Sequence, residues 1–371
     1  MKFSKELLIP FGIALLSLIF SLVILPGISL NLFQNPRIAE LGFLEAWSIW
    51  DAPHYLDIAD SWYQTSGDDA YWIVFLPLYP ILVGAVGFLP LLGILESGFL
   101  VSIVCALAAA VVFYKLLRLD ENKDVSIFTV LILFVFPTSF FLFLPYPESL
   151  FLLLILLTFH NLRRGNFLLG SLLAMLATAT KIAGLALIPV IFVELILYHI
   201  QSRKQVKFLE AFLILNLPIL GFLFYLFINY STFGDIFYFQ KAQSINWNTG
   251  FYPVVPGFKQ AVSFTSDPEF ESALYLGFGQ IVAFSLTIIT VIYSYFKMRK
   301  SYFIFSLAFL LIYGSMSFWL SLPRYLLTLF PLYIMIGRLA QNKVFLGLWV
   351  FLSILLLFVL GTIALEHGSV L

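Results

Sequence analysis

Long apolar segments alternate with short polar ones from one end of the chain to the other. Most are about 20 residues long, which is the length that an α-helix needs to cross the roughly 30 Å hydrocarbon core of a bilayer. Because helices satisfy their own backbone hydrogen bonds in lipid, this pattern predicts an all-α polytopic membrane protein. We expect a single integral membrane domain over residues 1–371, with eleven transmembrane helices near residues 8–28, 97–117, 126–145, 148–162, 167–180, 183–199, 209–229, 273–296, 302–320, 325–340 and 344–365.

Composition agrees with this pattern. The chain is 61% hydrophobic and 11% charged, whereas soluble domains are about 25% charged. A net charge of zero provides no basic surface for nucleic acid, so no nucleic-acid partner is expected. The single cysteine, Cys105, excludes an intrachain disulfide, and no His or Cys spacing predicts a metal site. We expect no cofactor, leave a divalent metal open, and interpret the first apolar segment as a retained helix rather than a signal peptide.

The segment 73–94 decides the topology. It is apolar enough to span, but it contains three prolines, Pro77, Pro80 and Pro90. Cytoplasmic loops are enriched in Lys and Arg. If 73–94 does not cross, fifteen of the 20 Lys and Arg residues are cytoplasmic; if it crosses, only six are. We therefore predict that 73–94 lies at or dips into the outer interface, that the N-terminus is cytoplasmic, and that 29–94 and 230–272 form the outer loops. The five outer cations are then Arg37, Lys181, Lys241, Lys259 and Arg324.

The first outer loop carries an unusual stretch, "WSIWDAPHYLDIADSWYQ", residues 47–64. Asp51 is a candidate general base, because a carboxylate walled by aromatic rings at an interface can acquire a raised pKa. It is also a candidate helix N-cap, since Ala52 and Pro53 follow it, and both roles can hold together. His54, one turn later, is expected to orient Asp51 or to contact a substrate.

The rest of this stretch predicts an amphipathic interfacial helix. Asp57 and Asp60 recur at helical spacing and are expected to face water. An apolar stripe is expected beside them, formed by Tyr55, Ile58, Ala59 and Trp62.

Further candidates lie in the other outer turns. Glu148 is either a helix-dipole partner or a second carboxylate of the site. Lys181 and Arg324 either bind a lipid-linked phosphate or snorkel towards headgroups. The loop 230–272 contains aromatic residues that either cap the surface or stack on sugars, and Lys241 and Gln243 are expected to reach a phosphate or hydroxyls. The aromatic residues are Phe237, Tyr238, Phe239 and Trp247.

Several short motifs resemble those of the PIG-V family, the second mannosyltransferases of GPI-anchor assembly, and of its prokaryotic relatives. The most specific is Trp-Asp-x-x-His-aromatic-x-x-Ile-Ala, which begins at Trp50. The others follow in the family's order, between residues 47 and 333. They are "FLPLYPIL" at 75–82, "YPESLF" at 146–151 with Pro147 where the family has Ser, "ATATKIAGL" at 177–185 with Lys181 where arginine is common, "FGDIFYFQKAQSINW" and "LPRYLLTLFPLY".

This resemblance implies a GT-C glycosyltransferase fold with interfacial helices in the first outer loop. It implies inverting transfer of a hexose, most naturally mannose, from a polyprenyl- or dolichyl-phosphate sugar to a hydroxyl of a lipid-linked or cell-envelope glycan on the outer or lumenal face. On this basis Asp51 acts as base, with His54 and Glu148 beside it, and Arg324, Lys181 and Lys241 bind the donor phosphate. The expected substrate-binding residues are Trp50, Tyr55, Tyr146, Gln243 and Trp247.

The resemblance also leaves room for different membranes and for another class of protein. The chain is shorter than the eukaryotic enzymes, so we expect a prokaryotic relative in the plasma membrane; a eukaryotic one would lie in the endoplasmic reticulum. Membrane lipids surround it in either case. The alternative is a multi-spanning lipid or solute transporter or flippase, which would place charges inside the bundle and show two related halves. Here the ionisable residues gather at one predicted interface.

Overall fold

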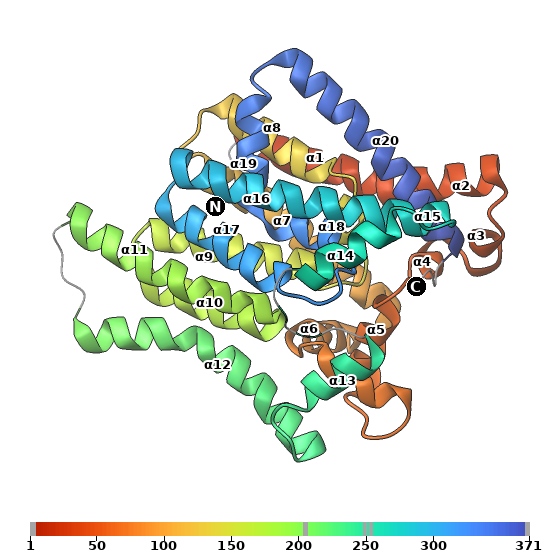
Figure 1. Cartoon of the computed structure of the whole chain (residues 1–371), viewed down its shortest axis with the longest axis horizontal. Coiled ribbons are helices and arrows are strands. Elements are labelled where there is room, and N and C mark those ends of the chain that lie inside the picture. Colours follow the sequence, from red (N-terminus) through yellow and green to blue (C-terminus); the bar gives the residue numbers. More distant parts are fainter. Residues whose placement is uncertain (1–4, 203–206, 248–249, 251, 253–254, 368–371) are drawn as a thin grey trace. The chain divides into compact units, whose positions relative to one another are not determined.

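The computed structural model describes residues 5–202, 207–247, 250, 252 and 255–367, which form helices joined by loops (Figure 1). The chain divides into two compact units. Unit 1 comprises Met1–Trp62, Tyr79–Leu156 and Tyr333–Leu371, and unit 2 comprises Tyr63–Leu78 and Leu157–Leu332. Three cations predicted to be cytoplasmic, Lys2, Arg203 and Lys204, lie outside the described residues.

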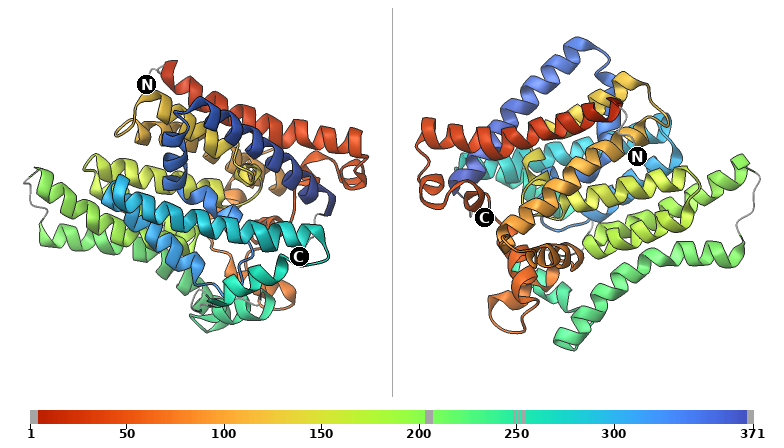
Figure 2. Two further views of the ribbon diagram at one scale, coloured as in Figure 1. Left: turned by 45° about the horizontal axis from the view of Figure 1, so that its top comes forward. Right: turned by 180° about the vertical axis from the view of Figure 1, so that it is seen from behind.

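Unit 1 is built from the two ends of the chain and a middle segment. Its helices are η1 (Lys5–Leu7), α1 (Leu8–Ile19), η2 (Phe20–Ile24), α2 (Leu25–Phe33), α3 (Pro36–Leu41), α4 (Phe43–Ala46), α5 (Ala52–Ser61), α6 (Leu78–Gly87), α7 (Ile94–Leu117), α8 (Lys123–Phe134), η4 (Ser139–Leu142), the first half of α9 (Glu148–Arg163), most of α19 (Phe330–Leu339) and α20 (Lys343–His367). The consecutive segments α1, η2 and α2 form one continuous helix over Leu8–Phe33, drawn in red in Figure 2.

Unit 2 is built from the central part of the chain. Its helices are η3 (Asp68–Val74), the second half of α9, α10 (Phe167–Thr180), η5 (Ile182–Ala186), α11 (Leu187–Ser202), α12 (Phe208–Phe233), α13 (Tyr238–Asn246), α14 (Val255–Phe264), α15 (Phe270–Ser272), η6 (Ala273–Gly279), α16 (Gln280–Lys297), α17 (Lys300–Gly314), α18 (Leu322–Tyr325) and η7 (Leu326–Thr328).

Among the described residues, six helices are long and apolar enough to cross a bilayer. They are Leu8–Phe33, Ile94–Leu117, Ile182–Gln201, Phe208–Phe233, Phe270–Lys297 and Lys343–Glu366. The predicted count of eleven is not confirmed. Several predicted spans are shorter apolar helices, Phe167–Thr180, Lys300–Gly314 and Phe330–Leu339.

The prediction of one continuous helix over 126–145 is wrong. α8 ends at Phe134, and the short 3₁₀ helix η4 follows. Pro137 lies between them and has no N–H to donate to a preceding turn, so the helical ladder stops there. The buried carbonyl of Phe134, at the end of α8, accepts hydrogen bonds from the hydroxyls of Ser17 (2.6 Å) and Ser139 (3.0 Å).

The segment expected to form one interfacial helix over 73–94 is also interrupted. η3 and α6 pass the test for an apolar span together, but they are bent by 114° at their junction. Pro77 stands in the break, where it removes a donor and restricts the residue before it. A sharp bend of this kind marks either a broken span or a re-entrant loop, so the non-crossing topology stays a prediction.

In unit 2, α10 and α12 lie side by side (Figures 1 and 2). Pro218 stands inside α12 and cannot donate to the carbonyl of Ile214 one turn earlier. The hydroxyl of Ser171 on α10 donates to that carbonyl instead, and Thr178 donates to the carbonyl of Pro218 at 2.5 Å. Neighbouring hydroxyls of this kind allow proline within a helix in lipid.

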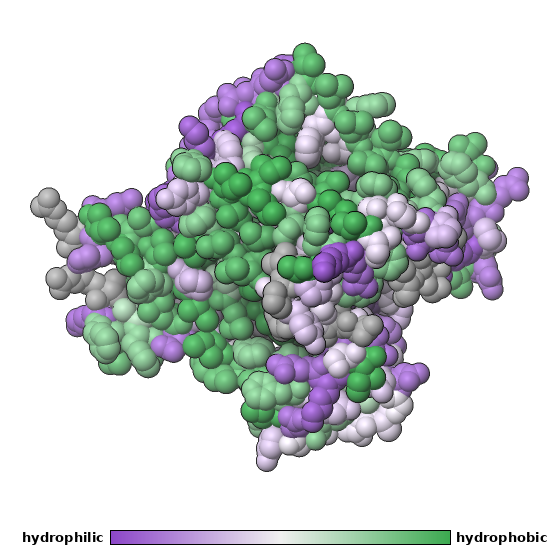
Figure 3. All heavy atoms as spheres, viewed as in Figure 1, coloured by the Kyte–Doolittle hydropathy of each residue, from purple (hydrophilic) through white to green (hydrophobic). Residues whose placement is uncertain are grey.

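Large apolar side chains are exposed along helices such as α16. Val282, Ile289, Ile292 and Phe296 are each at least half exposed, and the visible face over α16 is correspondingly apolar (Figure 3). A soluble protein rarely exposes so continuous an apolar surface. These faces are the expected contacts with lipid.

Candidate functional site

Asp51 lies in a tight turn between α4 and α5. It directly precedes Ala52, the first residue of α5, and Pro53 follows at a position where helices tolerate proline. Asp51 therefore takes the predicted N-cap position. However, its carboxylate makes no capping hydrogen bond to α5, a helix described in full, and its backbone is helical, with φ −78° and ψ −12°. A capping residue normally has an extended backbone. The N-cap interpretation is right about position and wrong about the side chain.

Trp50, immediately before Asp51, adopts a left-handed backbone with φ 49°. A residue that carries a Cβ rarely adopts this conformation, which costs about 1–3 kcal/mol and persists only when its surroundings enforce it. One constraint is aromatic packing. The Trp50 indole stacks on Phe141 with ring centroids 5.4 Å apart, and Phe141 stacks on Phe140 at 4.5 Å.

Tyr146 supplies the second constraint. Its side chain is fully buried, and its hydroxyl donates to the carbonyl of Ile49 (2.7 Å) and accepts from the backbone N–H of Asp51 (3.1 Å). These two groups flank Trp50, so one hydroxyl ties both sides of the strained residue. The Tyr146 ring meets Phe141 edge-on at 5.1 Å. The backbone of Asp51 is therefore fixed by a segment that lies some 95 residues away along the chain.

Two further tyrosines pack beside Tyr146. Tyr55, buried on α5, packs against Tyr146 with ring centroids 6.2 Å apart and against Tyr79 at 5.5 Å. The Tyr79 hydroxyl lies 2.8 Å from Ser102 Oγ, and Ser102 donates to the carbonyl of Tyr146 at 3.3 Å. The structure brings together, around the Asp51 turn, all three residues of unit 1 that are predicted to bind substrate: Trp50, Tyr55 and Tyr146.

The exposed face of α5 follows the predicted amphipathic pattern. Asp57 and Asp60 are exposed, Ile58 is buried, and His54 is half-buried. Trp62, predicted to extend the apolar stripe, does not do so. α5 ends one residue earlier, and Trp62 turns away with φ 61° and is 43% exposed.

Glu148 is the first residue of α9 and is completely buried. It follows Tyr146 by two residues, so the segment that fixes the Asp51 turn also places this second carboxylate within unit 1. The roles expected for His54 and Glu148, which are to hold Asp51 or sugar hydroxyls, stay predictions. Among the described residues, no three His, Cys, Asp or Glu side chains are grouped to hold a metal ion.

In unit 2, two of the predicted phosphate-binding cations share one aromatic ring. The Lys181 ammonium lies 4.8 Å from the ring centroid of Tyr325, and the Arg324 guanidinium carbon lies 5.3 Å from the same centroid. Arg324 is only 6% exposed, and Tyr325 stacks on Tyr313 at 4.5 Å. A ring face attracts cations, and two cations in an apolar region form a favourable site for an anion.

The backbone before Arg324 is held by a buried amide. Gln280, fully buried at the start of α16, donates to the carbonyls of Tyr275 and Leu320, each at 3.1 Å. Its carbonyl oxygen accepts from the N–H of Leu322 at 3.0 Å. Sequence reasoning missed Gln280 and Tyr325. An amide within a predicted membrane span is the signal that should have identified Gln280.

Lys241, the third predicted phosphate ligand, has an acidic partner. Its ammonium lies 2.7 Å from Asp235, and its side chain is 67% exposed. The hydrogen bond from Lys241 lowers the pKa of Asp235, and the same bond raises the pKa of Lys241. Gln243 and Trp247 follow half-buried, and Trp247 meets Phe75 edge-on at 5.5 Å.

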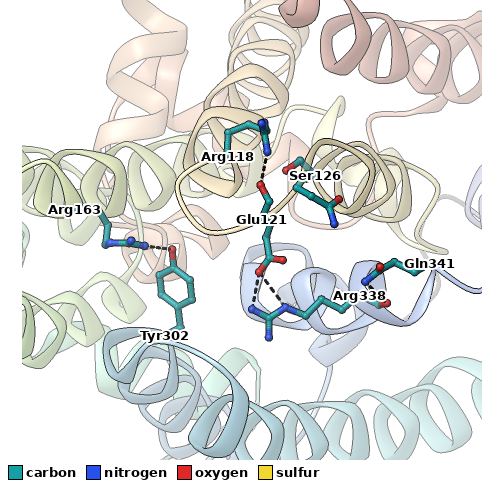
Figure 4. A network of polar contacts seen from close by, with 8 residues as sticks. Arg118, Glu121, Ser126, Arg163, Tyr302, Arg338 and Gln341 are labelled. Atoms are coloured by element: carbon teal, nitrogen blue, oxygen red, sulfur yellow. Dashed lines mark hydrogen bonds and ion pairs between the residues drawn. The ribbon is translucent and has the colours of Figure 1, made fainter.

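Other charged residues form hydrogen bonds and ion pairs within each unit (Figure 4). In unit 1, Arg338 donates through Nε (3.0 Å) and Nη2 (2.6 Å) to Glu121, whose backbone carbonyl accepts from Arg118. In unit 2, Arg163 donates to the Tyr302 hydroxyl at 3.0 Å.

A buried ion pair in unit 2 was also missed by sequence reasoning. Arg299 donates to both carboxylate oxygens of Glu194, at 2.7 and 2.8 Å, and the Ser301 hydroxyl donates to the same carboxylate at 2.6 Å. Two-point pairing of this kind neutralises a buried carboxylate and fixes its geometry. The sequence feature that indicates this pair is Glu194, a single acidic residue within the apolar span predicted over 183–199.

Two known proteins are similar in sequence to part of this chain. Over 180 residues the chain is 31% identical to the human (Homo sapiens) GPI alpha-1,6-mannosyltransferase 2, and the matched region covers 44% of this chain and 36% of that relative. Over 212 residues it is 30% identical to the protein of the same name from Cricetulus griseus, and this match covers 52% of this chain and 40% of that relative. The chain thus spans less than half the length of these relatives.

No protein-family model matches the chain, and no solved structure matches it. The sequence relationship to the two mannosyltransferases therefore covers about half of the chain. Together with the apolar helices, it supports a multi-pass integral membrane protein.

Proposed function

We propose that this chain is a membrane glycosyltransferase that transfers a hexose, most naturally mannose, from a polyprenyl- or dolichyl-phosphate sugar to a hydroxyl of a lipid-linked or cell-envelope glycan. The observation that carries the proposal is the 30–31% identity to two proteins named as mannosyltransferases. The fixed turn at Asp51 and the paired cations of unit 2 supply groups of the kind that this reaction needs.

Asp51 is the proposed general base. The acceptor oxygen attacks the anomeric carbon of the donor sugar, its proton passes to the Asp51 carboxylate, and the bond from that carbon to the phosphate oxygen breaks. A single displacement of this kind inverts the anomeric configuration. Base assistance requires the carboxylate at hydrogen-bond distance from the acceptor hydroxyl. A backbone held by Tyr146 suits that requirement, because it limits the positions that the carboxylate samples.

Lys181 and Arg324 are the proposed partners of the donor phosphate. The lipid phosphate leaves with the bonding electron pair, and preorganised cations stabilise the charge that develops on it. Their shared contact with Tyr325 keeps both cations in one region of unit 2. Lys241 is a weaker candidate, because it already pairs with Asp235.

The surroundings complete the proposal. Exposed apolar faces such as that of α16 would accommodate the prenyl chain. We further propose a GT-C architecture, a site on the outer face and a prokaryotic source, with His54, Glu148, Gln243 and Trp247 contacting the sugar or the acceptor.

The test is transfer by the purified protein in nanodiscs. We expect labelled mannose to pass from polyprenyl-phosphate-mannose to glycolipid acceptors, and Asp51→Asn to lower kcat by about 100- to 10,000-fold. Asp57→Asn, which changes an exposed acid on the helix that follows Asp51, is the matched control and should retain parental kcat. An Asp51→Asn protein that works at the parental rate overturns the base assignment. Transfer only from a nucleotide sugar overturns the donor assignment.

A further inference from the structure

The hydroxyl of Tyr146 has a specific relation to the candidate base. It donates to the carbonyl of Ile49 and accepts from the N–H of Asp51, the two backbone groups on either side of Trp50. A hydroxyl can do both at one atom, because it carries one donor and two acceptor lone pairs. The two bonds span the residue whose φ of 49° is strained.

The ring of Tyr146 is held independently of its hydroxyl. Phe141 meets it edge-on at 5.1 Å, Tyr55 packs on it at 6.2 Å, and Ser102 donates to its carbonyl at 3.3 Å. Removal of the hydroxyl alone therefore leaves the ring in place. What changes is the pairing of the Ile49 carbonyl and the Asp51 N–H, and with it the restraint on the Trp50 backbone.

We propose that Tyr146 is a positioning residue for Asp51, rather than a substrate ligand. Its hydroxyl keeps Trp50 in the left-handed conformation and so aims the carboxylate of the next residue. This inference rests on the proposed role of Asp51 as base. Without the hydroxyl, Trp50 relaxes towards ordinary negative φ, and the peptide that carries Asp51 rotates. Misplacement of a catalytic group by about 1 Å can reduce a rate by about 100-fold.

The variant that tests this is Tyr146→Phe, and its matched control is Tyr79→Phe. Tyr79 is also fully buried in this cluster, but its hydroxyl contacts the carbonyl of Gly98 (3.0 Å) and Ser102 Oγ (2.8 Å), not the Asp51 turn. We expect Tyr146→Phe to lower kcat by about 10- to 100-fold with the KM for the donor unchanged. Tyr79→Phe should keep kcat within about threefold of the parent, because the 49–51 backbone keeps its bonds.

Two further measurements separate positioning from a general loosening of the fold. If Tyr146 acts through Asp51, the double variant Asp51→Asn/Tyr146→Phe should be no slower than Asp51→Asn alone, since residues that act as a unit are not additive. Hydrogen exchange by mass spectrometry should show faster exchange in the peptide covering residues 49–51 of Tyr146→Phe, and no change there in Tyr79→Phe.

The outcomes are distinct. A parental kcat in Tyr146→Phe, unchanged exchange at 49–51, an equal loss in Tyr79→Phe, or a double variant far slower than Asp51→Asn would each overturn the positioning role. A parent protein that transfers no sugar from a polyprenyl phosphate overturns the proposed function instead, and that result appears before any variant is compared.

Discussion

The Asp51 turn of unit 1 and the Arg324 turn of unit 2 are held by related means. In each, a fully buried polar side chain from a distant helix or loop bonds to backbone groups beside the candidate functional residue. Tyr146 bonds to the carbonyl of Ile49 and the N–H of Asp51. Gln280 bonds to the carbonyls of Tyr275 and Leu320 and to the N–H of Leu322. Both side chains bond to backbone groups beside the charged residue.

The two turns differ in how much strain they hold. Trp50 has the left-handed φ of 49°, and the Tyr146 hydroxyl bonds to the backbone groups on both of its sides, whereas Ser321, at the start of the second turn, has a negative φ of −142° and lies within a set of three amide bonds. A strained conformation changes geometry when a bond that restrains it is lost. An unstrained turn with several buried bonds loses stability instead, because its backbone groups become unsatisfied. The first should therefore respond in rate and the second in stability.

The largest effect expected from unit 2 concerns Arg324 itself. Arg324→Gln removes a cation that is 6% exposed and lies beside Tyr325. We expect kcat/KM for the polyprenyl-phosphate donor to fall by about 100-fold, as when a preorganised group at a leaving anion is lost. Arg324→Lys should recover only part of this, because an ammonium lacks the planar pair of donors.

The control for Arg324 is Lys259→Gln, which changes an exposed residue among the five predicted outer cations and should behave as the parent. An Arg324→Gln protein within about threefold of the parent would mean that the rigid turn serves folding and not the donor phosphate, with so small a change typical of an uninvolved surface residue.

A smaller effect, on stability, is expected for Gln280→Leu. The change leaves two carbonyls and one N–H without the amide, at a cost of about 2 kcal/mol or more. The melting temperature in nanodiscs should fall, while kcat at low temperature stays within about threefold of the parent. Gln240→Leu, an exposed glutamine, is the matched control. A loss of kcat without a lower melting temperature would contradict the difference between the two turns.

The sequence singled out several residues of these turns but not the geometry of the turns. Residue type and motif pointed to Asp51, Tyr55, Tyr146, Lys181 and Arg324, whose chemical roles stay predictions, and helical periodicity correctly predicted that Asp57 and Asp60 are exposed. Hydropathy found apolar helices but not the break at Pro137, because the averaged hydropathy of a segment does not register one missing donor. Pro77 raised doubt that the segment 73–94 crosses the membrane, but the 114° bend beside it was not predicted. The bonds from Tyr146 and Gln280 join residues far apart in the chain, and such pairing depends on tertiary packing, which no local pattern encodes.

The smallest effect is expected at the Asp235–Lys241 pair, where Lys241 is exposed and Asp235 is half-buried. The bond lowers the pKa of Asp235 and raises that of Lys241. The ion pair stabilises the fold at pH values above the ordinary pKa of a carboxylate, and this stabilisation is lost only as the pH falls through the lowered pKa of Asp235. We expect Asp235→Asn to leave the melting temperature unchanged at neutral pH, as is usual for exposed pairs. Loss of the bond should instead lower the pKa of Lys241, so that its amine is acylated faster at mildly alkaline pH, with Lys259 as the internal reference. Equal acylation of Lys241 in parent and variant would show that the pair does not persist in solution, and would remove the reason for ranking Lys241 below Lys181 and Arg324 as a ligand of the donor phosphate.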